Sequence, residues 1–241
     1  MHKRIGKLAA LAALSVAFCL ALTVQTNAQG FIGEMLKRMN DHNKSLQSLQ
    51  ADVTMVKYES VLRVIDTYEG EVWYLPEVLT GKQQHELKMR LDWKSENGRS
   101  REESISVNGD DFELWNHDRH QVMAGKIQKS KDSSKINTVF GFMGMGRTQL
   151  RANYTFDYLG DEEVRGGVKT IHVRLNPKVK MSYKSAELWV DADGMPVQAK
   201  IVEKNDDSTT VLLSHLQKNE TIKEAIFTLE YDRKKVKITK M

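Results

Sequence analysis

From Leu49 onward, apolar and polar residues alternate along the chain with a period of two. The first run places Leu49, Ala51, Val53 and Met55 at every second position, with polar residues between them. Successive side chains of a strand point to opposite faces, so this spacing is typical of a strand with one buried face. The pattern continues almost to the C-terminus and predicts a mostly β protein.

Short runs of this kind are separated by turn sequences such as Asn108-Gly109 and Asp193-Gly194. Two-residue turns with glycine favour hairpins, so the strands should follow one another in an antiparallel meander without helical crossovers. After the first strand we expect strands at 61–68, 70–75, 87–94, 103–108, 111–116, 119–124, 154–160, 169–175, 185–191, 196–204, 208–216, 225–231 and 235–239.

Two segments depart from the strand pattern. Residues 31–47 have apolar side chains three, four or seven positions apart, which predicts one amphipathic helix. Residues 136–145 are apolar but are interrupted by Gly141 and Gly144, and a polar, basic stretch precedes them. Because glycine weakens a helix by roughly 1 kcal/mol relative to alanine, we expect a mobile apolar insert there.

The N-terminus has the features of a secretion signal. Three basic residues within the first seven precede an apolar run from Leu8 to Val24, and Thr26 and Ala28 occupy the small-residue positions of a cleavage site. We expect residues 1–28 to be removed, the alternative being an uncleaved anchor. Lipidation at Cys19 is not expected because bulky Phe18 precedes it.

The remaining chain, 29–241, has the size of a single β domain. Without the three basic residues of the signal, 33 of the 36 Lys and Arg stand against 32 Asp and Glu, which gives no support to a nucleic-acid partner. The one cysteine of the chain leaves with the signal, so no disulfide is expected. We find no further apolar run near the roughly 20 residues of a membrane-spanning helix. The chain should therefore work in a Gram-negative periplasm.

A search for catalytic and metal-binding patterns identifies none that is convincing. The histidines are scattered, and His117 and His120 straddle an expected turn. Asp191-Ala192-Asp193-Gly194 resembles the start of a calcium loop, but Val202 stands where the closing glutamate belongs. We therefore expect no enzyme activity, no metal and no cofactor.

The apolar residues are the unusual feature, because large and adaptable side chains suit a surface that binds varied apolar partners. The full set is Trp73, Met89, Leu91, Trp93, Leu114, Trp115, Met123, Phe140, Phe142, Met143, Met145 and Trp189. Each of them could simply fill a β core, but the glycines make 140–145 a poor core element and favour a lid.

Three stretches resemble the LolA-like family of periplasmic lipoprotein carriers. They are Leu46-Gln47-Ser48-Leu49-Gln50-Ala51-Asp52-Val53, Gly70-Glu71-Val72-Trp73-Tyr74-Leu75-Pro76 and Glu187-Leu188-Trp189-Val190-Asp191-Ala192-Asp193-Gly194-Met195-Pro196. Their order and the closing stretch 225–229 also match, and the similarity covers nearly all of the chain after the signal.

The resemblance implies an incomplete, strongly curved antiparallel β-barrel with an N-terminal helix and a helical or loop lid. Such a half barrel shields the acyl chains of lipoproteins between an inner-membrane transporter and an outer-membrane acceptor, and we expect a monomer. The cavity would be lined by Val53, Met55, Trp73, Leu75, Met89, Leu91, Trp93, Leu114 and Met123. The lid would contain Phe140, Phe142, Met143 and Met145.

Two features depart from familiar members of that family. A basic residue usually precedes the proline of the Trp strand in those members and helps to hold the lid closed, whereas Leu75 stands here. The segment 77–88 also looks like an insertion relative to them. The resemblance therefore does not determine how the lid is held closed. Two alternative functions also stay open: a carrier of another lipid or glycolipid, or a sensor of mislocalised lipoproteins. An enzyme that uses an unrecognised pair of carboxylates is a third.

Overall fold

The computed structural model describes residues 30–78, 85–127, 141–142 and 145–240. In this part of the chain a single twelve-stranded sheet dominates, with an N-terminal helix at residues 30–45. The strands are β1 (Leu49–Glu59), β2 (Val64–Leu75), β3 (Lys88–Glu96), β4 (Arg99–Asn108), β5 (Asp111–Asn116), β6 (Gln121–Lys126), β7 (Tyr154–Val164), β8 (Val168–Pro177), β9 (Tyr183–Val190), β10 (Pro196–Glu203), β11 (Ser208–Lys218) and β12 (Lys237–Lys240). The described residues also include the short helix α3 (Arg147–Asn153) and the 3₁₀ helix η2 (Glu224–Phe227).

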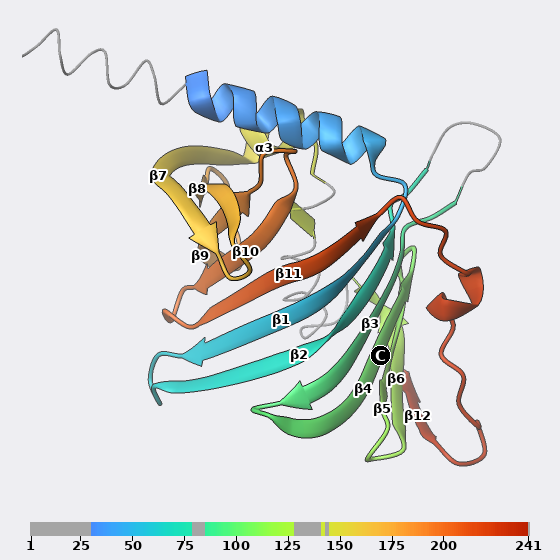
Figure 1. Ribbon diagram of the computed structural model, residues 1–241. Coiled ribbons are helices and arrows are strands. Elements are labelled where there is room, and N and C mark those ends of the chain that lie inside the picture. Colours follow the sequence, from blue (N-terminus) through green and yellow to red (C-terminus); the bar gives the residue numbers. More distant parts are fainter. Residues whose placement is uncertain (1–29, 79–84, 128–140, 143–144, 241) are drawn as a thin grey trace, which may run out of the picture.

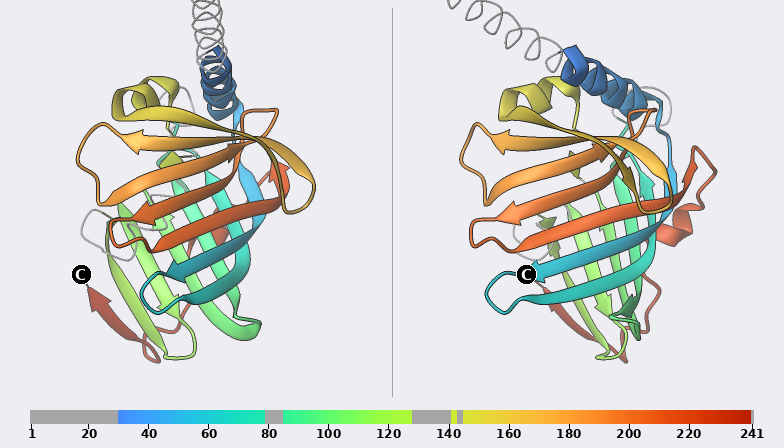
Figure 2. Two further views of the ribbon diagram at one scale, coloured as in Figure 1. Left: turned by 90° about the vertical axis from the view of Figure 1, so that its left-hand side faces the viewer. Right: turned by 60° about the vertical axis from the view of Figure 1, so that its left-hand side comes forward.

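Two antiparallel meanders, β1–β6 and β7–β11, are joined by the pairing of β1 with β11. β7 is one edge of the sheet, and at the other edge β12 pairs with β6 in parallel. The sheet bends strongly between its two halves, and the N-terminal helix lies across one end of the fold (Figures 1 and 2). The expected incomplete, strongly curved antiparallel half barrel is therefore confirmed, with one parallel strand at its edge.

Most of the expected elements are present, and the corrections are local. The helix expected at 31–47 is observed at 30–45, while α3 was not expected. Residues 61–63, expected in a strand, form the turn between β1 and β2. The strand expected at 225–231 is wrong, because η2 and an irregular segment occupy those positions.

The segment that follows β11 runs over the outer face of β3 and β4. Its carbonyl groups accept hydrogen bonds from side chains of the sheet: Arg90 donates to the Ile226 and Thr228 carbonyls at 3.4 Å, and the Ser106 hydroxyl donates to the Phe227 carbonyl. A backbone satisfied in this way needs no strand partner, which explains why 225–231 is not a strand.

The N-terminal helix buries its apolar stripe in the main hydrophobic cluster and lies against the turn between β9 and β10. Met35, Leu36 and Met39 are buried in the main hydrophobic cluster. The Arg38 guanidinium donates a hydrogen bond of 3.2 Å to the Ala192 carbonyl. Gly194, at φ +89°, approaches the helix so closely that a Cβ atom would lie 2.3 Å from the Arg38 carbonyl carbon. The Asp-Ala-Asp-Gly motif is therefore a helix-docking turn.

Gly194→Ala should destabilise the fold more than glycine replacement at a free turn. Both Gly194 and Gly98 have positive φ, which costs an alanine about 1 kcal/mol, but a Cβ at Gly98 would have no atom within 4 Å. We expect Gly98→Ala to lose only that amount and Gly194→Ala to lose about 2 kcal/mol more, in the range of overpacked sites. Urea unfolding measures both, and equal losses would contradict the close helix contact.

His42 of the same helix should make stability depend on pH. It is buried, and burial together with the nearby Lys218 ammonium lowers its pKa from 6.5, although Asp191 and Asp193 oppose the shift. Because the unfolded chain takes up the proton first, the stabilising effect is complete above pH 6.5 and is lost as the pH falls through the lowered pKa.

We expect the urea midpoint to fall between about pH 7.5 and 5.5, and to fall less in His42→Gln. His120→Asn serves as the control because His120 is an exposed turn residue, and it should keep the full dependence on pH. An identical fall in wild type and His42→Gln would contradict this assignment.

Candidate functional site

The inner face of the bent sheet carries a continuous apolar surface. Residues paired across strands lie on the same face, so the register identifies its members. One row runs across six strands without a polar residue: Ala51 (β1), Val72 (β2), Leu91 (β3), Ile105 (β4), Leu114 (β5) and Met123 (β6). The next row has Leu49, Tyr74, Met89, Val107 and Phe112.

The second meander continues this surface. Met55 of β1 pairs with Val211 of β11, and the row then passes through Ala199, Leu188 and Val173. These side chains belong to the same hydrophobic cluster as the first meander. The two halves of the sheet therefore line one apolar interior.

The structure brings together seven of the nine residues expected to line the cavity: Val53, Met55, Met89, Leu91, Trp93, Leu114 and Met123. It does not bring Trp73 and Leu75 into this group, because the pleat places them on the outer face. Trp73 pairs with Gln50 and Arg90, and it is buried there outside the main cluster.

Most of the inner face is covered. Val53, Leu91 and Trp93 have 4% or less of their surface exposed, whereas Leu114 and Met123, near the β12 edge, are only partly buried. A ligand could reach the partly buried pair with little change. Contact with Leu91, which has no exposed surface, would require a covering element to move aside.

A band of charged and hydroxyl groups ends the apolar surface at the side remote from the N-terminal helix. The Arg101 guanidinium binds the carboxylates of Glu96 and Glu103, the latter at 2.9 Å, and lies 5.4 Å from the centre of the Tyr68 ring. Burial and a hydrogen bond to Glu96 raise the pKa of Tyr68 to about 12. The Lys57 ammonium also lies over this ring, at 4.8 Å.

This polar band is a matched ion-pair network. Hydrogen bonds from Tyr68 and Arg101 lower the pKa of Glu96, which keeps its carboxylate ionised. A general acid or base working near neutral pH needs the opposite shift for a carboxyl group. The carboxylates of this band are thus paired with Arg101 within the protein.

Of the four expected lid residues, the structure describes Phe142 and Met145, while Phe140 and Met143 lie outside the described residues. Phe142 has no exposed surface, and its ring lies 6.0 Å from that of Tyr154. Met145 packs against the main cluster, and its carbonyl accepts a hydrogen bond of 3.1 Å from Asn43 of the N-terminal helix. Both residues therefore cover the interior beside that helix.

The outer face contains the other aromatic motif residues. Trp189 stacks on His172 at 3.9 Å between ring centres and donates a hydrogen bond of 2.7 Å to Glu162, tying β7, β8 and β9 together. Trp115 stacks on His117 at 3.7 Å. The pair His117 and His120 belongs to no group that could hold a metal ion, and the described part of the chain contains no such group.

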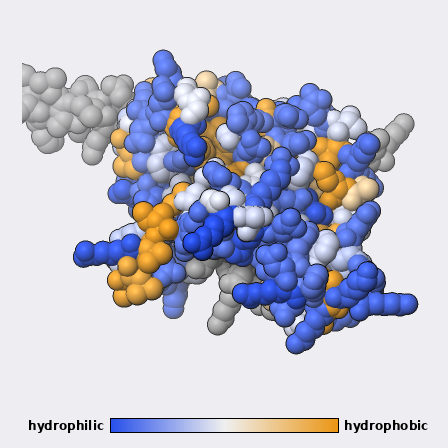
Figure 3. All heavy atoms as spheres, turned by 60° about the horizontal axis from the view of Figure 1, so that its bottom comes forward, coloured by the Kyte–Doolittle hydropathy of each residue, from blue (hydrophilic) through white to orange (hydrophobic). Residues whose placement is uncertain are grey.

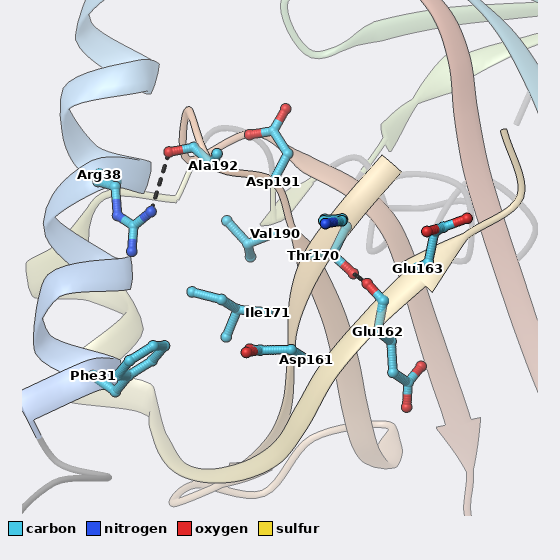
Figure 4. A pocket seen from close by; sticks show the side chains of 11 residues that line it. Phe31, Arg38, Asp161, Glu162, Glu163, Thr170, Ile171, Val190, Asp191 and Ala192 are labelled. Carbon is cyan, nitrogen blue, oxygen red and sulfur yellow. Dashed lines mark hydrogen bonds between the residues drawn. The ribbon is translucent and has the colours of Figure 1, made fainter. Parts of the chain in front are cut away.

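A separate open pocket of about 460 Å³ lies between the start of the N-terminal helix and β7–β9 (Figure 4). Phe31, Ile171 and Val190 supply its apolar side chains. Glu162 and Asp191, two of its four acidic residues, are engaged within the protein: Glu162 binds Trp189 and His172, and Asp191 accepts hydrogen bonds from the turn amides of Asp193 and Met195. Seven of its eleven lining residues are charged or carry a hydroxyl group, unlike the apolar rows of the inner face, and the pocket is a weaker candidate for an apolar ligand.

Comparison with known proteins supports the same reading of the fold. The family model described as outer membrane lipoprotein carrier protein LolA matches residues 91–230. The chain belongs to the LolA family. The match includes the β3–β6 residues of the first apolar row and the helix-docking turn, and members of this family act as carriers of lipoproteins or lipids outside the cytoplasm.

The chain is also similar to solved structures at low sequence identity. An uncharacterized conserved protein from Thermus thermophilus is 10% identical, with a TM-score of 0.54, and the match covers 87% of this chain and 99% of that one. The Mycobacterium tuberculosis lipoprotein LppX is 19% identical, with a TM-score of 0.47 and coverage of 79% and 96%. No curated protein sequence matches the chain. Among the described helices, none has the length and apolar character needed to cross a membrane.

Replacing Phe142 with alanine should test whether its segment is part of the core or a loosely held lid. Loss of a fully buried phenylalanine from a core costs about 3–5 kcal/mol. We expect the free energy of unfolding to fall by about 3 kcal/mol in Phe142→Ala and by less than about 1 kcal/mol in Phe31→Ala, whose side chain is 47% exposed. A small loss at Phe142 would show that this segment contributes little to closing the interior.

Proposed function

We propose that the chain is an exported carrier that shields the acyl chains of lipoproteins while they move from the inner to the outer membrane. The observation that carries this proposal is the six-strand apolar row from Ala51 to Met123, in an open sheet of the LolA family. In this proposal residues 1–28 are the cleaved signal, and 29–241 act as one domain in the periplasm. The domain works as a monomer and without a cofactor.

The energetics of transfer favour a site of this kind. At about 0.8 kcal/mol per methylene, a sixteen-carbon chain exposed to water costs roughly 12 kcal/mol. An apolar interior offsets that cost without bond chemistry. Release to an acceptor requires that the interior bind no more tightly than the next site does, so an interior that must open on binding suits a carrier.

The described interior supplies both parts of an amphiphile site. The apolar rows would take the acyl chains, and the band formed by Lys57, Tyr68, Glu96 and Arg101 would face the polar linkage. An inner-membrane transporter would load the carrier and an outer-membrane acceptor would unload it. Leu75 replaces the basic residue that helps to hold the lid closed in familiar members, and it lies on the outer face. The interior would therefore be kept closed by other contacts, such as the hydrogen bond from Asn43 to the Met145 carbonyl.

The decisive experiment mixes the purified protein with inner-membrane vesicles that contain labelled lipoproteins. We expect lipoproteins to leave the vesicles in soluble complex with the protein. Mass spectrometry of material co-purified from the periplasm identifies the cargo, and free phospholipid or glycolipid in place of lipoprotein would change the cargo while keeping the carrier. Repeated absence of any acylated species would rule out both.

The partly buried pair Leu114 and Met123 offers a variant that should keep the fold. Leu114→Asn combined with Met123→Asn places two amides in the apolar row, and we expect at least a tenfold loss of affinity for an apolar fluorescent dye, because burying an unpaired amide costs about 1–3 kcal/mol. Val56→Asn is the matched control, since Val56 is partly buried on the outer face of β1. Equal dye affinity in all three proteins would remove this row from the site.

A further inference from the structure

The turn between β1 and β2 exposes a group of aliphatic side chains that the fold does not use. Val61 is 84% exposed, Leu62 69%, Ile65 61% and Val64 42%. Figure 3 shows a continuous apolar patch on this protruding hairpin, at the end of the molecule remote from the N-terminal helix. We call residues 60–65 the hairpin tip.

The hairpin tip projects beyond the strands on both sides of it. β1 ends its pairing with β11 at Tyr58 and Ser208, and β2 begins its pairing with β3 at Tyr68 and Glu96. The ladder between β1 and β2 continues past both points and ends at Glu59 and Val64. The turn residues 61–63 and the first residues of β2 therefore project beyond the neighbouring strands.

Two neighbouring turns hold the base of the hairpin. The Ser60 backbone amide donates a hydrogen bond of 2.8 Å to the Asp207 carboxylate. On the other side the Thr67 amide donates to the Asn97 side chain at 2.8 Å, and the Asn97 amide donates to the Thr67 carbonyl at 2.7 Å. These hydrogen bonds hold the backbone on both sides of the tip, whose apolar side chains are exposed to solvent.

The shape and side chains of the hairpin tip favour a lipid surface over a protein as its partner. It is narrow and convex, its apolar residues are all aliphatic, and its single charge is the exposed Arg63 at the turn, with no acidic residue in 60–65. A bilayer accepts such a wedge without a complementary pocket: aliphatic side chains enter the acyl boundary and a guanidinium remains at the phosphates. A protein partner would need a deep groove of matching shape.

The backbone limits how far the hairpin tip can enter. Strand pairing and the bond between Ser60 and Asp207 satisfy its base, while the turn at 61–63 still needs polar contact. This combination suits the interface between headgroups and acyl chains. We propose that the hairpin tip inserts into the surface of a lipid bilayer and docks the protein there. This proposal rests on the hairpin and not on the cargo of the interior.

Flotation with vesicles of phosphatidylethanolamine and phosphatidylglycerol tests the proposal. We expect the wild-type protein to float with the vesicles, and to do so in about 0.5 M salt, where attraction between charges is screened within a few ångströms. The variant that combines Val61→Ser with Leu62→Ser should bind at least tenfold more weakly. Leu159→Ser combined with Val179→Ser removes two exposed apolar side chains elsewhere and should bind as wild type does.

Three results would overturn the proposal: no flotation of the wild type, equal flotation of the tip variant, or a wild-type dimer that the tip variant converts to a monomer. The last would make a second copy of the chain the partner. Dye binding in the absence of vesicles separates this test from that of the carrier, because the tip variant should bind the dye as wild type does. A blue shift of an environment-sensitive dye attached to Leu62→Cys, on addition of vesicles, provides a second measure of insertion.

Discussion

The pairing of β1 with β11 is the contact on which the rest of the structure depends. Each meander alone is a sheet with one apolar face, and a single twisted sheet cannot cover that face with itself. β1 pairs with β2 on one edge and with β11 on the other, so its alternation sets which face of both halves is apolar. Because the sheet also bends, both apolar faces turn toward the same interior.

Much of the fold can be predicted from the sequence because alternation and turn chemistry are local. The β5 strand, flanked by turns containing glycine or asparagine, was expected at the residues where it occurs. Alternation does not show which side chains face inward where four apolar residues follow one another, as in Val72-Trp73-Tyr74-Leu75. Register with β3 is needed to show that Val72 and Tyr74 face inward while Trp73 and Leu75 face outward.

Other parts depend on contacts between segments far apart in the chain. The sequence pattern predicts a strand at Phe227 and Leu229, yet both side chains are buried on the outer face of the sheet. Arg90 and Ser106 donate hydrogen bonds to the carbonyl groups of Ile226, Phe227 and Thr228. The outward position of Trp73, Trp115 and Trp189 also depends on how each strand pairs with its neighbours. Large aromatic residues indicate burial, but only pairing across strands shows which surface they bury.

The two ends of the interior differ in what they can do. At one end the N-terminal helix, Phe142 and Met145 close the apolar surface through packing against the main cluster, and a hydrogen bond from Asn43 joins the helix to Met145. At the other end the network around Arg101 replaces apolar contacts by ion pairs. Burial at Leu91 is complete, so access to the deepest part of the interior is a conformational change with a free-energy cost. That cost weakens binding relative to an open groove, and in a molecule that must also give up what it holds, weaker binding makes release faster.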